Sequence, residues 1–363
     1  NPDTAKIETL GTFNYNTAIP PISLGVTVGF LDNAGKVSRF FEMMNIQRSL
    51  SPDVLDQSAP IPTLLPKNIN LLTSSKENTF VLAAVEGENT IYGYKYFDSG
   101  QKRLQSAWFK WTLRKSIKYH AIINDSYYVV DYDNSLLRFD LKTDDTTGVI
   151  GKYPIHLDNY KTISASEFTY VDELDDDGKR TNKTIFGSQP GFSTGGTLVA
   201  YDTTSSDENY GRYAVAKWNT GIGFWELPGD WTKNEVYLGY VFDMEVKLPT
   251  IYVAKTSGES IKNDVNASLI VHRAKLALGN TGRYTTVLTR TGRETYEELI
   301  EPTIQDAYEF GSLPIDEDRI HTVPIYDRNT NASLTLKSSH PAPATLLSMS
   351  WEGDYTDKYY KRA

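Results

Sequence analysis

The chain has 363 residues, of which 39% are hydrophobic and 23% are charged; it has a formal net charge of −9 and no cysteine. The missing cysteine excludes disulfides, thiolate metal ligands and a cysteine nucleophile. The acidic balance disfavours tight nucleic-acid binding, which needs basic groups to neutralise phosphates. No apolar run approaches the roughly 20 residues that span a bilayer.

The residue types favour strands and turns, because 24 Tyr, 14 Phe and 6 Trp stand among frequent Gly, Asn, Asp and Ser. The chain opens Asn1-Pro2-Asp3, without Met or a signal-peptide pattern, so we expect a piece of a longer protein. The runs 27–31 and 37–41 flank a turn that contains Gly35 and predict a hairpin.

Residues 51–70 contain four prolines, and these predict an ordered connection without a regular helix or a central strand. Two three-stranded meanders follow, and their first strands begin 40 positions apart, within the period of propeller blades. We therefore predict a partial β-propeller over residues 1–157. The expected strands are 79–85, 91–97, 107–113, 119–123, 127–132 and 136–141.

Beyond the meanders the strand pattern loosens, and residues 158–232 predict long β-hairpin insertions that project from a body. Short strands then return at regular spacing and predict a β-sandwich-like domain over residues 233–363. Its expected strands are 236–242, 250–254, 267–278, 284–289 and 332–336. The predicted fold class is therefore all-β, with a partial propeller, long hairpins and a C-terminal sandwich.

Several segments resemble the C-terminal portion of the tail nozzle (tail tubular B) family of T7-like, short-tailed bacteriophages. The resemblance extends over most of residues 27–363. It is carried by residues 323–334 (VPIYDRNTNASL), 341–343 (PAP), 351–355 (WEGDY), 105–113 (QSAWFKWTL), 248–253 (LPTIYV) and 269–274 (LIVHRA). It implies that the middle region corresponds to a nozzle tip and the C-terminal sandwich to a platform domain.

The same resemblance implies a structural role in the virion tail, with no enzymatic activity and no cofactor. Family members are expected to form a ring of six copies below the tail adaptor protein, with tail fibres attached. Viral DNA would pass through the channel without sequence-specific binding, and the tail would meet the host cell surface during infection. An acidic conduit is compatible with this role because it repels phosphates.

The alternative hypothesis is a virion-borne or secreted β-propeller that binds or hydrolyses surface glycans, for which two carboxylates and stacking aromatics suffice. The best local candidates are Glu226 and Asp230, which stand beside Trp225 and Trp231. Loops of this composition are more often turns packed on a sheet, so we predict no catalytic residue.

Trp108 and Trp111 suggest a stacking platform for bases. Strand alternation, however, places them on opposite faces of their strand.

An acidic run between two expected strands predicts a solvated hairpin tip. It also resembles the first half of a calcium loop, but Thr184 replaces the bidentate Glu at the twelfth position, so we predict no metal site. In a ring, six such tips would either approach the channel axis as a gate or lie on the outer wall. The gate candidates are Asp172, Glu173, Asp175, Asp176 and Asp177.

Overall fold

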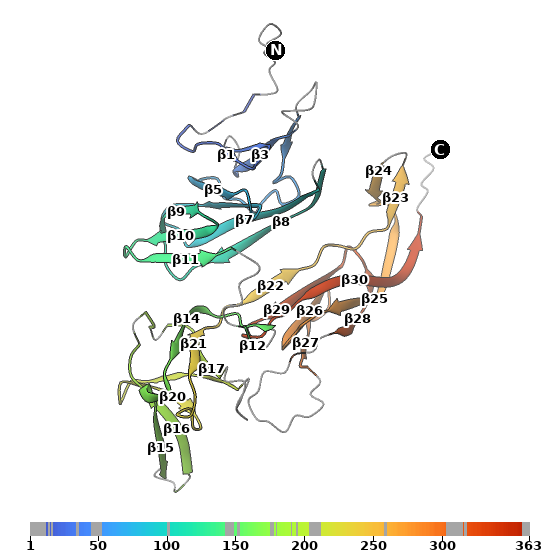
Figure 1. The fold of residues 1–363 in the computed structure, drawn as a ribbon. Helices are drawn as coiled ribbons and strands as arrows, with labels where there is room; N and C mark the ends of the chain where they lie inside the picture. The colour runs from blue at the N-terminus through green and yellow to red at the C-terminus, as the bar shows by residue number, and fades with distance from the viewer. Residues whose placement is uncertain are drawn as a thin grey trace. The chain divides into compact units, whose positions relative to one another are not determined.

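The structure is a computed structural model of the chain (Figure 1). It describes residues 12–13, 15, 17–33, 36–44, 53–99, 102–141, 149–150, 153–174, 178, 180–189, 191–193, 195–202, 212–257, 260–302, 315 and 318–357. These residues form antiparallel β-sheets and a short 3-10 helix, Ala165–Glu167. The all-β prediction is confirmed. Within the ranges given, no helix is long and apolar enough to cross a membrane.

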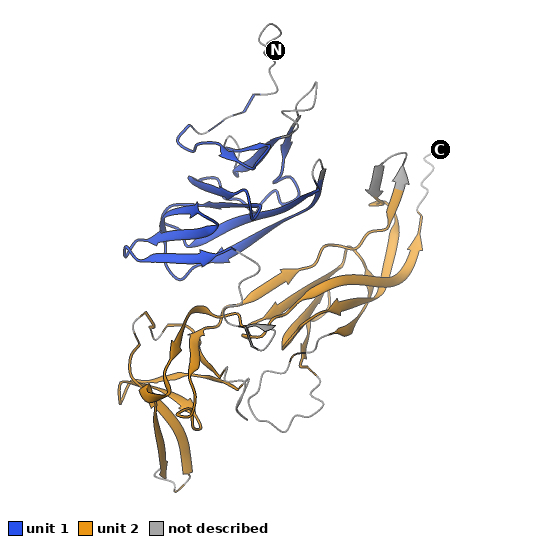
Figure 2. Ribbon diagram, in the orientation of Figure 1, with its two compact units in different colours: residues 1–145 blue, residues 146–363 orange. Residues whose placement is uncertain are grey.

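The chain divides into two compact units, residues 1–145 and 146–363 (Figure 2). Unit 1 contains three antiparallel sheets in chain order. The first comprises β1 (Ile22–Ser23), β2 (Val28–Asp32), β3 (Arg39–Met44) and β4 (Asp53–Asp56). The second comprises β5 (Leu71–Ser75), β6 (Phe80–Ala84), β7 (Thr90–Ser99) and β8 (Lys102–Thr112). The third comprises β9 (Ile117–Ile123), β10 (Ser126–Asp131) and β11 (Leu136–Asp140).

The hairpin and both meanders predicted from the sequence are present in unit 1. The β2–β3 hairpin closes at the pair Asp32 and Arg39. Three strands were not predicted: the two-residue β1 comes before the hairpin, β4 lies inside the proline-rich segment and β5 begins after it. β4 occupies the edge of its sheet and ends before Pro60, so the prolines do not interrupt a backbone ladder.

Strand β8 packs against both neighbouring sheets, as alternation predicts. Trp108 joins the core between the first and second sheets, where its ring centroid lies 4.9 Å from that of Tyr94. Trp111 joins the core between the second and third sheets and stacks on Phe139 at 6.2 Å. Both indole rings therefore stabilise the stack of sheets, and neither forms a platform for bases.

The first part of unit 2, the tip module, contains two four-stranded sheets. One has the order β14 (Asp158–Ile163), β21 (Val236–Tyr240), β17 (Leu198–Asp202) and β18 (Tyr213–Val215). The other has the order β15 (Thr169–Leu174), β16 (Arg180–Phe186), β20 (Phe224–Pro228) and β19 (Lys217–Asn219). Their inner faces share a core that includes Phe186, Leu238 and Trp225. The region 158–232, for which projecting hairpins were predicted, therefore also contributes most strands of a module with its own core.

The second part of unit 2, the platform module, is a sandwich of two sheets. The first has the order β22 (Met244–Lys247), β29 (Ala332–Ser338), β26 (Tyr284–Arg290) and β27 (Tyr296–Ile300). The second has the order β28 (Arg319–Arg328), β25 (Ser268–Leu278) and β30 (Leu346–Thr356). Two further hairpins are β12 (Val149–Ile150) with β13 (Tyr153–Pro154) and β23 (Ala254–Ser257) with β24 (Ser260–Asn263). Alternate side chains of the two sheets meet in one core, as expected of a sandwich.

A buried polar network joins the first two sheets of unit 1. Glu42 of β3 has no solvent exposure, and its carboxylate accepts hydrogen bonds from Thr27 Oγ1 at 2.6 Å and Gln57 Nε2 at 2.9 Å. Arg103 of β8 donates to both carboxylate oxygens of Glu42. It also donates to Asp98 at 2.9 Å and lies over the Tyr96 ring.

Burial alone would lower the pKa of Arg103, but its hydrogen bonds to Asp98 and Glu42 hold that pKa above the ordinary value. Each polar group of the pair therefore has a partner, which is the condition under which a buried ion pair is tolerated.

We predict that Glu42→Gln lowers the free energy of unfolding by about 3 kcal/mol, because it leaves the Arg103 guanidinium buried without its main counter-charge. Equilibrium urea denaturation measures the change. The control is Arg138→Gln, which breaks a surface ion pair with Asp140 and should change stability by less than about 1 kcal/mol. Equal unfolding midpoints for Glu42→Gln and the unaltered chain would contradict the prediction.

Candidate functional site

The acidic run lies at the end of the β15–β16 hairpin in the tip module. Thr169 pairs with Ile185 at one end of this hairpin and Leu174 with Arg180 at the other. At the base, β16 also pairs with β20, from Lys183 to Phe186. Beyond Asn182, the described hairpin has two strands only and is exposed to solvent. The structure thus places the run on a projecting, two-stranded ribbon.

Two of the five gate candidates fall within the described residues. Asp172 and Glu173 lie side by side on β15 and are exposed, and Leu174 next to them is 71% exposed. Asp175, Asp176 and Asp177 lie outside the described residues. Gly178 follows with a φ of +75°, a backbone conformation that favours glycine.

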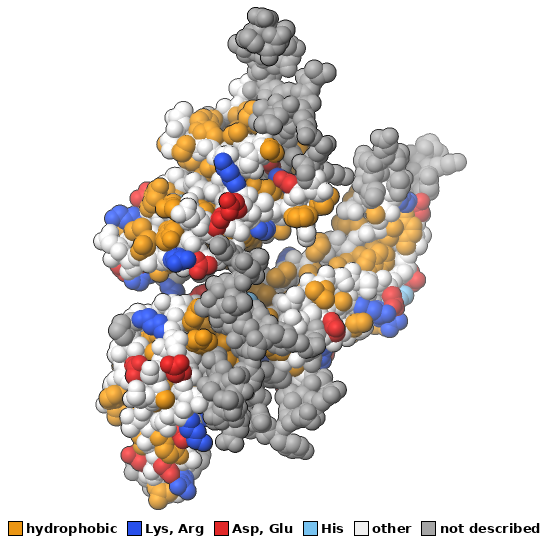
Figure 3. All heavy atoms as spheres, viewed as in Figure 1, with side chains coloured by type: hydrophobic (Ala, Val, Ile, Leu, Met, Phe, Trp, Pro, Cys, Tyr) orange, Lys and Arg blue, Asp and Glu red, His pale blue; other side chains and the backbone are white. Residues whose placement is uncertain are grey.

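Asp172 is paired with a cation, which the sequence analysis did not anticipate. Arg180 Nε donates to Asp172 Oδ1 at 2.8 Å, and Arg180 Nη2 donates to Oδ2. Hydrogen bonding by Arg180 holds the pKa of Asp172 below its usual value. Figure 3 shows acidic and basic side chains next to each other at the end of this module. The hairpin therefore carries less uncompensated negative charge than its carboxylates alone suggest.

The residue at the twelfth position of the calcium-loop pattern, Thr184, faces the core of the tip module and not the acidic tip. Thr184 lies in β16 opposite Tyr170 and is fully buried. Its hydroxyl donates to the Gly229 carbonyl at 2.7 Å and accepts from the Trp231 amide at 2.9 Å. Among the residues that the structure describes, no group of three or more metal-ligating side chains occurs.

The two carboxylates considered for glycan hydrolysis have structural partners. Glu226 accepts hydrogen bonds from Lys183 at 2.8 Å and Asn219 at 2.9 Å, and the Lys183 bond is the main cause of its lowered pKa. Asp230 accepts from the side chain and backbone of Thr232, which likewise lowers its pKa. A general acid in a glycosidase needs a raised pKa, so neither group has the environment that this role requires.

The tryptophans beside these carboxylates belong to the core of the tip module. Trp225 is 4% exposed and Trp231 is 3% exposed. Arg212 lies over the Trp231 ring at 4.2 Å and donates to the carbonyls of Pro228 and Asp230. Neither indole ring is available to stack on a sugar.

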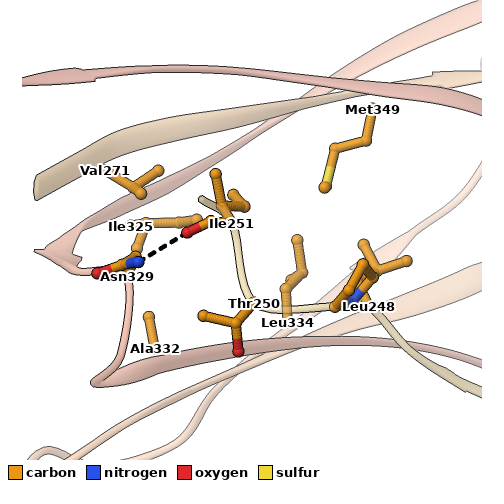
Figure 4. A pocket seen from close by; sticks show the side chains of 10 residues that line it. Leu248, Thr250, Ile251, Val271, Ile325, Asn329, Ala332, Leu334 and Met349 are labelled. Atoms are coloured by element: carbon orange, nitrogen blue, oxygen red, sulfur yellow. Dashed lines mark hydrogen bonds between the residues drawn. The ribbon is translucent and has the colours of Figure 1, made fainter. Parts of the chain in front are cut away.

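A small cavity lies in the platform module, where the segment 248–251 crosses between the two sheets (Figure 4). Its volume is about 20 Å³ and its lining is mostly apolar, with Leu334 and Met349 among the side chains. Asn329 Nδ2 donates to the Ile251 carbonyl at 2.7 Å and fixes this segment in place. Ligand sites are usually hundreds of Å³ in volume, so this cavity is a packing gap of about one water molecule.

The comparison with protein families decides the identity. A profile of the family described as bacteriophage nozzle protein matches residues 1–362. The chain belongs to the bacteriophage nozzle protein family. This membership makes it a structural protein of the phage tail, located in the virion, within an assembly that oligomerises. No curated protein sequence matches the chain.

Comparison with solved structures adds no functional information on this nozzle protein. Exo-β-1,3-galactanase from Phanerochaete chrysosporium, in a variant bound to β-1,3-galactotriose, is 9% identical and has a TM-score of 0.24. That alignment covers 96% of this chain and 99% of the galactanase. The same enzyme with galactose is 8% identical over 91% and 93% of the two chains, with a TM-score of 0.22. Scores this low support no argument about fold or activity.

The sequence analysis missed Arg180 as a partner of the acidic run in the tip module. The signal that could have revealed it is the basic pair Lys179 and Arg180, which is separated from the acidic residues by Gly178 alone. In a hairpin, basic residues that follow the turn lie on the second strand, next to the acidic residues of the first strand. Asp172 is opposite Asn182 and not opposite Arg180, so the ion pair is diagonal, within reach of a long side chain.

We predict that Thr184→Val lowers the free energy of unfolding of the tip module by about 1–3 kcal/mol. The substitution keeps the side-chain shape but removes the hydroxyl that bonds both the Gly229 carbonyl and the Trp231 amide. Thermal unfolding measures the loss of stability, and hydrogen exchange of the amides of residues 224–231 shows whether the loss is in the tip module.

The matched control is Thr181→Val, since Thr181 donates to the Glu173 carbonyl at 3.1 Å on the exposed part of the same strand. Its effect should stay within about 0.5 kcal/mol. Equal losses of stability in the two variants would contradict the prediction, because the buried Thr184 hydrogen bonds would then contribute no more than an exposed one.

Proposed function

We propose that this nozzle protein assembles with further copies of itself into a closed ring of six, which forms the exit conduit for the genome at the end of the phage tail. The observation that carries the proposal is the family match over residues 1–362. Sheets with free edges support it, because ring closure covers edges that an isolated copy leaves exposed.

Viral DNA is the proposed cargo and is not a tightly bound ligand. The net charge of −9 gives a field that repels phosphates. Several cations of the described surface are paired with carboxylates, including Arg180 with Asp172, Arg273 with Glu352 and Arg138 with Asp140. Cations neutralised in this way contribute little to counterion release, so DNA would slide without being held.

The other proposed partners follow from the position of a nozzle in a tail. The tail adaptor protein would hold the ring on the virion side, tail fibres would attach around it, and the host cell surface would meet its far end. The proposed division into a partial propeller (1–157), a tip region (158–232) and a platform (233–363) assigns these contacts to different parts of the chain. Strand β21 (Val236–Tyr240) lies within the proposed platform range but pairs with β14 and β17 of the tip module.

The protein is proposed to have no enzymatic activity. The support is local: Glu226 and Asp230 have lowered pKa values and bonded partners, and the tryptophans beside them are buried. The alternative is glycan binding or hydrolysis by a virion-borne β-propeller. Release of sugar from host polysaccharide that disappeared in Glu226→Gln or Asp230→Asn would favour that alternative.

We expect the full-length protein, mixed with its adaptor protein, to elute as one closed oligomer with six times the mass of the chain. Light scattering coupled to size exclusion gives the mass, and negative-stain images give the symmetry. A stable monomer at virion-like concentrations in the presence of the adaptor would contradict the proposal.

The acidic hairpin tips are proposed to narrow the exit of this ring as a gate. Six copies of the tip carboxylates would repel one another when close together. Subunit packing would offset this repulsion, so the gate would be biased to open once packing loosens. The opposite placement, with hairpins on the outer wall, leaves the conduit intact and removes the gate.

If the tips form the gate, Arg180→Gln should release DNA sooner, since it removes the cation that neutralises Asp172. We expect virions of this variant to lose their genome on the order of a few-fold faster at low salt, with the difference shrinking as salt screens the charges. DNA release is followed with an intercalating dye.

Arg138→Gln, the same charge change on unit 1, is the control and should behave as the unaltered virion. Equal release by all three virions, or a tail reconstruction with the hairpins far from any constriction, would argue against the gate.

A further inference from the structure

Strand β30 forms a long edge of the three-stranded sheet in the platform module. It runs over eleven residues, Leu346–Thr356, and pairs with β25 on one side (Figure 1). Within the part of the chain that the structure describes, no strand pairs with its other side, and no backbone hydrogen bond runs outward from it. About half of its amides and carbonyls therefore point away from β25.

The opposite edge of the same sheet, β28, is blunted by its own sequence. Pro324 in the middle of β28 has no amide hydrogen to donate. Next to it, the register with β25 shifts, and Tyr326 has a φ of +46°. A proline and a bulge are two devices by which proteins prevent an edge strand from pairing with another chain.

β30 has fewer of these devices. It contains neither proline nor lysine. Its register with β25 shifts at Leu347, close to its first residue, and again between Glu352 and Gly353, where the extra residue, His272, belongs to β25. From Ser348 to Thr356 no residue of β30 has a positive φ. Its backbone therefore stays extended over a length that would allow several hydrogen bonds to an added strand.

One of the two carboxylates on β30, which would otherwise repel a partner, is neutralised within the sheet. Glu352 accepts from Arg273 at 2.5 Å and from Lys275, both on β25. His272 Nε2 lies 3.2 Å from Asp354. Charged side chains normally protect an edge, but Glu352 is held over β25 by Arg273 and Lys275, so Asp354 is the one exposed carboxylate on this strand.

Apolar side chains accompany this open backbone. Leu347 is 63% exposed and Tyr355 is 38% exposed, while Met349 and Trp351 are half-buried. Figure 3 shows hydrophobic side chains gathered over this part of the platform module. An exposed, extended and partly apolar edge strand is an association site unless something covers it.

We infer that the free edge of β30 is a contact surface between neighbouring copies of this chain, and that a segment of the next copy adds to it as a further strand. The inference rests on the proposed self-assembly and identifies one surface that makes it. The occupant is a second copy because nozzle proteins belong to an oligomeric assembly. The blunted β28 edge does not serve as the added strand, and the proposed ring excludes a symmetric contact of β30 with β30, because ring closure needs a contact between unlike surfaces.

Hydrogen exchange of the full chain, as monomer and as oligomer, tests the inference directly. In the monomer about half of the β30 amides should exchange fast, and in the oligomer these same amides should become protected. Peptides that cover β28 should exchange equally in both states and serve as the internal reference.

Two lysine variants form a matched pair. Ser350 and Thr322 are both exposed and both lie opposite Lys275, one on each side of β25. Ser350→Lys introduces the edge-protecting residue that β30 lacks and should raise the concentration needed for assembly at least about tenfold. Thr322→Lys places the same charge on the blunted edge and should leave that concentration within about twofold.

The outcomes separate this inference from the proposed ring. An oligomer whose β30 amides exchange as fast as those of the monomer would overturn the β30 contact and leave the ring standing. Amides already protected in the monomer would overturn it as well, because another segment of the same chain would then cover the edge. A chain that never assembles would overturn both.

Discussion

Backbone pairing between neighbouring antiparallel strands is the interaction on which the rest of this structure depends. The chain has no cysteine to cross-link it, and its described elements are almost entirely strands. Each sheet must therefore satisfy its amides and carbonyls laterally and bury a face against another sheet. Stacking supplies the buried faces, as Trp108 and Trp111 show on either side of β8. Lateral pairing ends at each outer strand, and these edges are where the single chain is incomplete.

The local parts of the fold could be predicted from the sequence because their signals are local. The β2–β3 hairpin and the two meanders have apolar alternation and turn residues within a few positions of each other. β4 could not be predicted, since four prolines mask a strand that needs only one satisfied side at the edge of a sheet. Nor could the partnership of β14 with β21, because it joins strands that are far apart in the chain and carry no mutual signature.

The residues of the candidate site could be predicted from the sequence, but the ion pairs among them could not. The sequence shows the acidic run and the flanking strands, but the ion pair of Asp172 with Arg180 depends on a diagonal register that composition does not specify. The burial of Thr184 could not be predicted either, because in the sequence it is an ordinary polar residue of a strand. Its burial results from a loop whose Gly229 lies 45 positions away and accepts its hydrogen bond.

The stability of the β15–β16 hairpin changes along its length, and this bears on how a gate would move. At the base, β16 pairs with both β15 and β20, and Thr184 ties it to the loop behind. Beyond Asn182 only two strands remain, and an isolated two-stranded ribbon is marginally stable in water. Its end can therefore open locally at little cost while the three-stranded base stays folded. The Asp172–Arg180 pair lies in this weak part, so electrostatic forces at the tip act on the segment least restrained by packing.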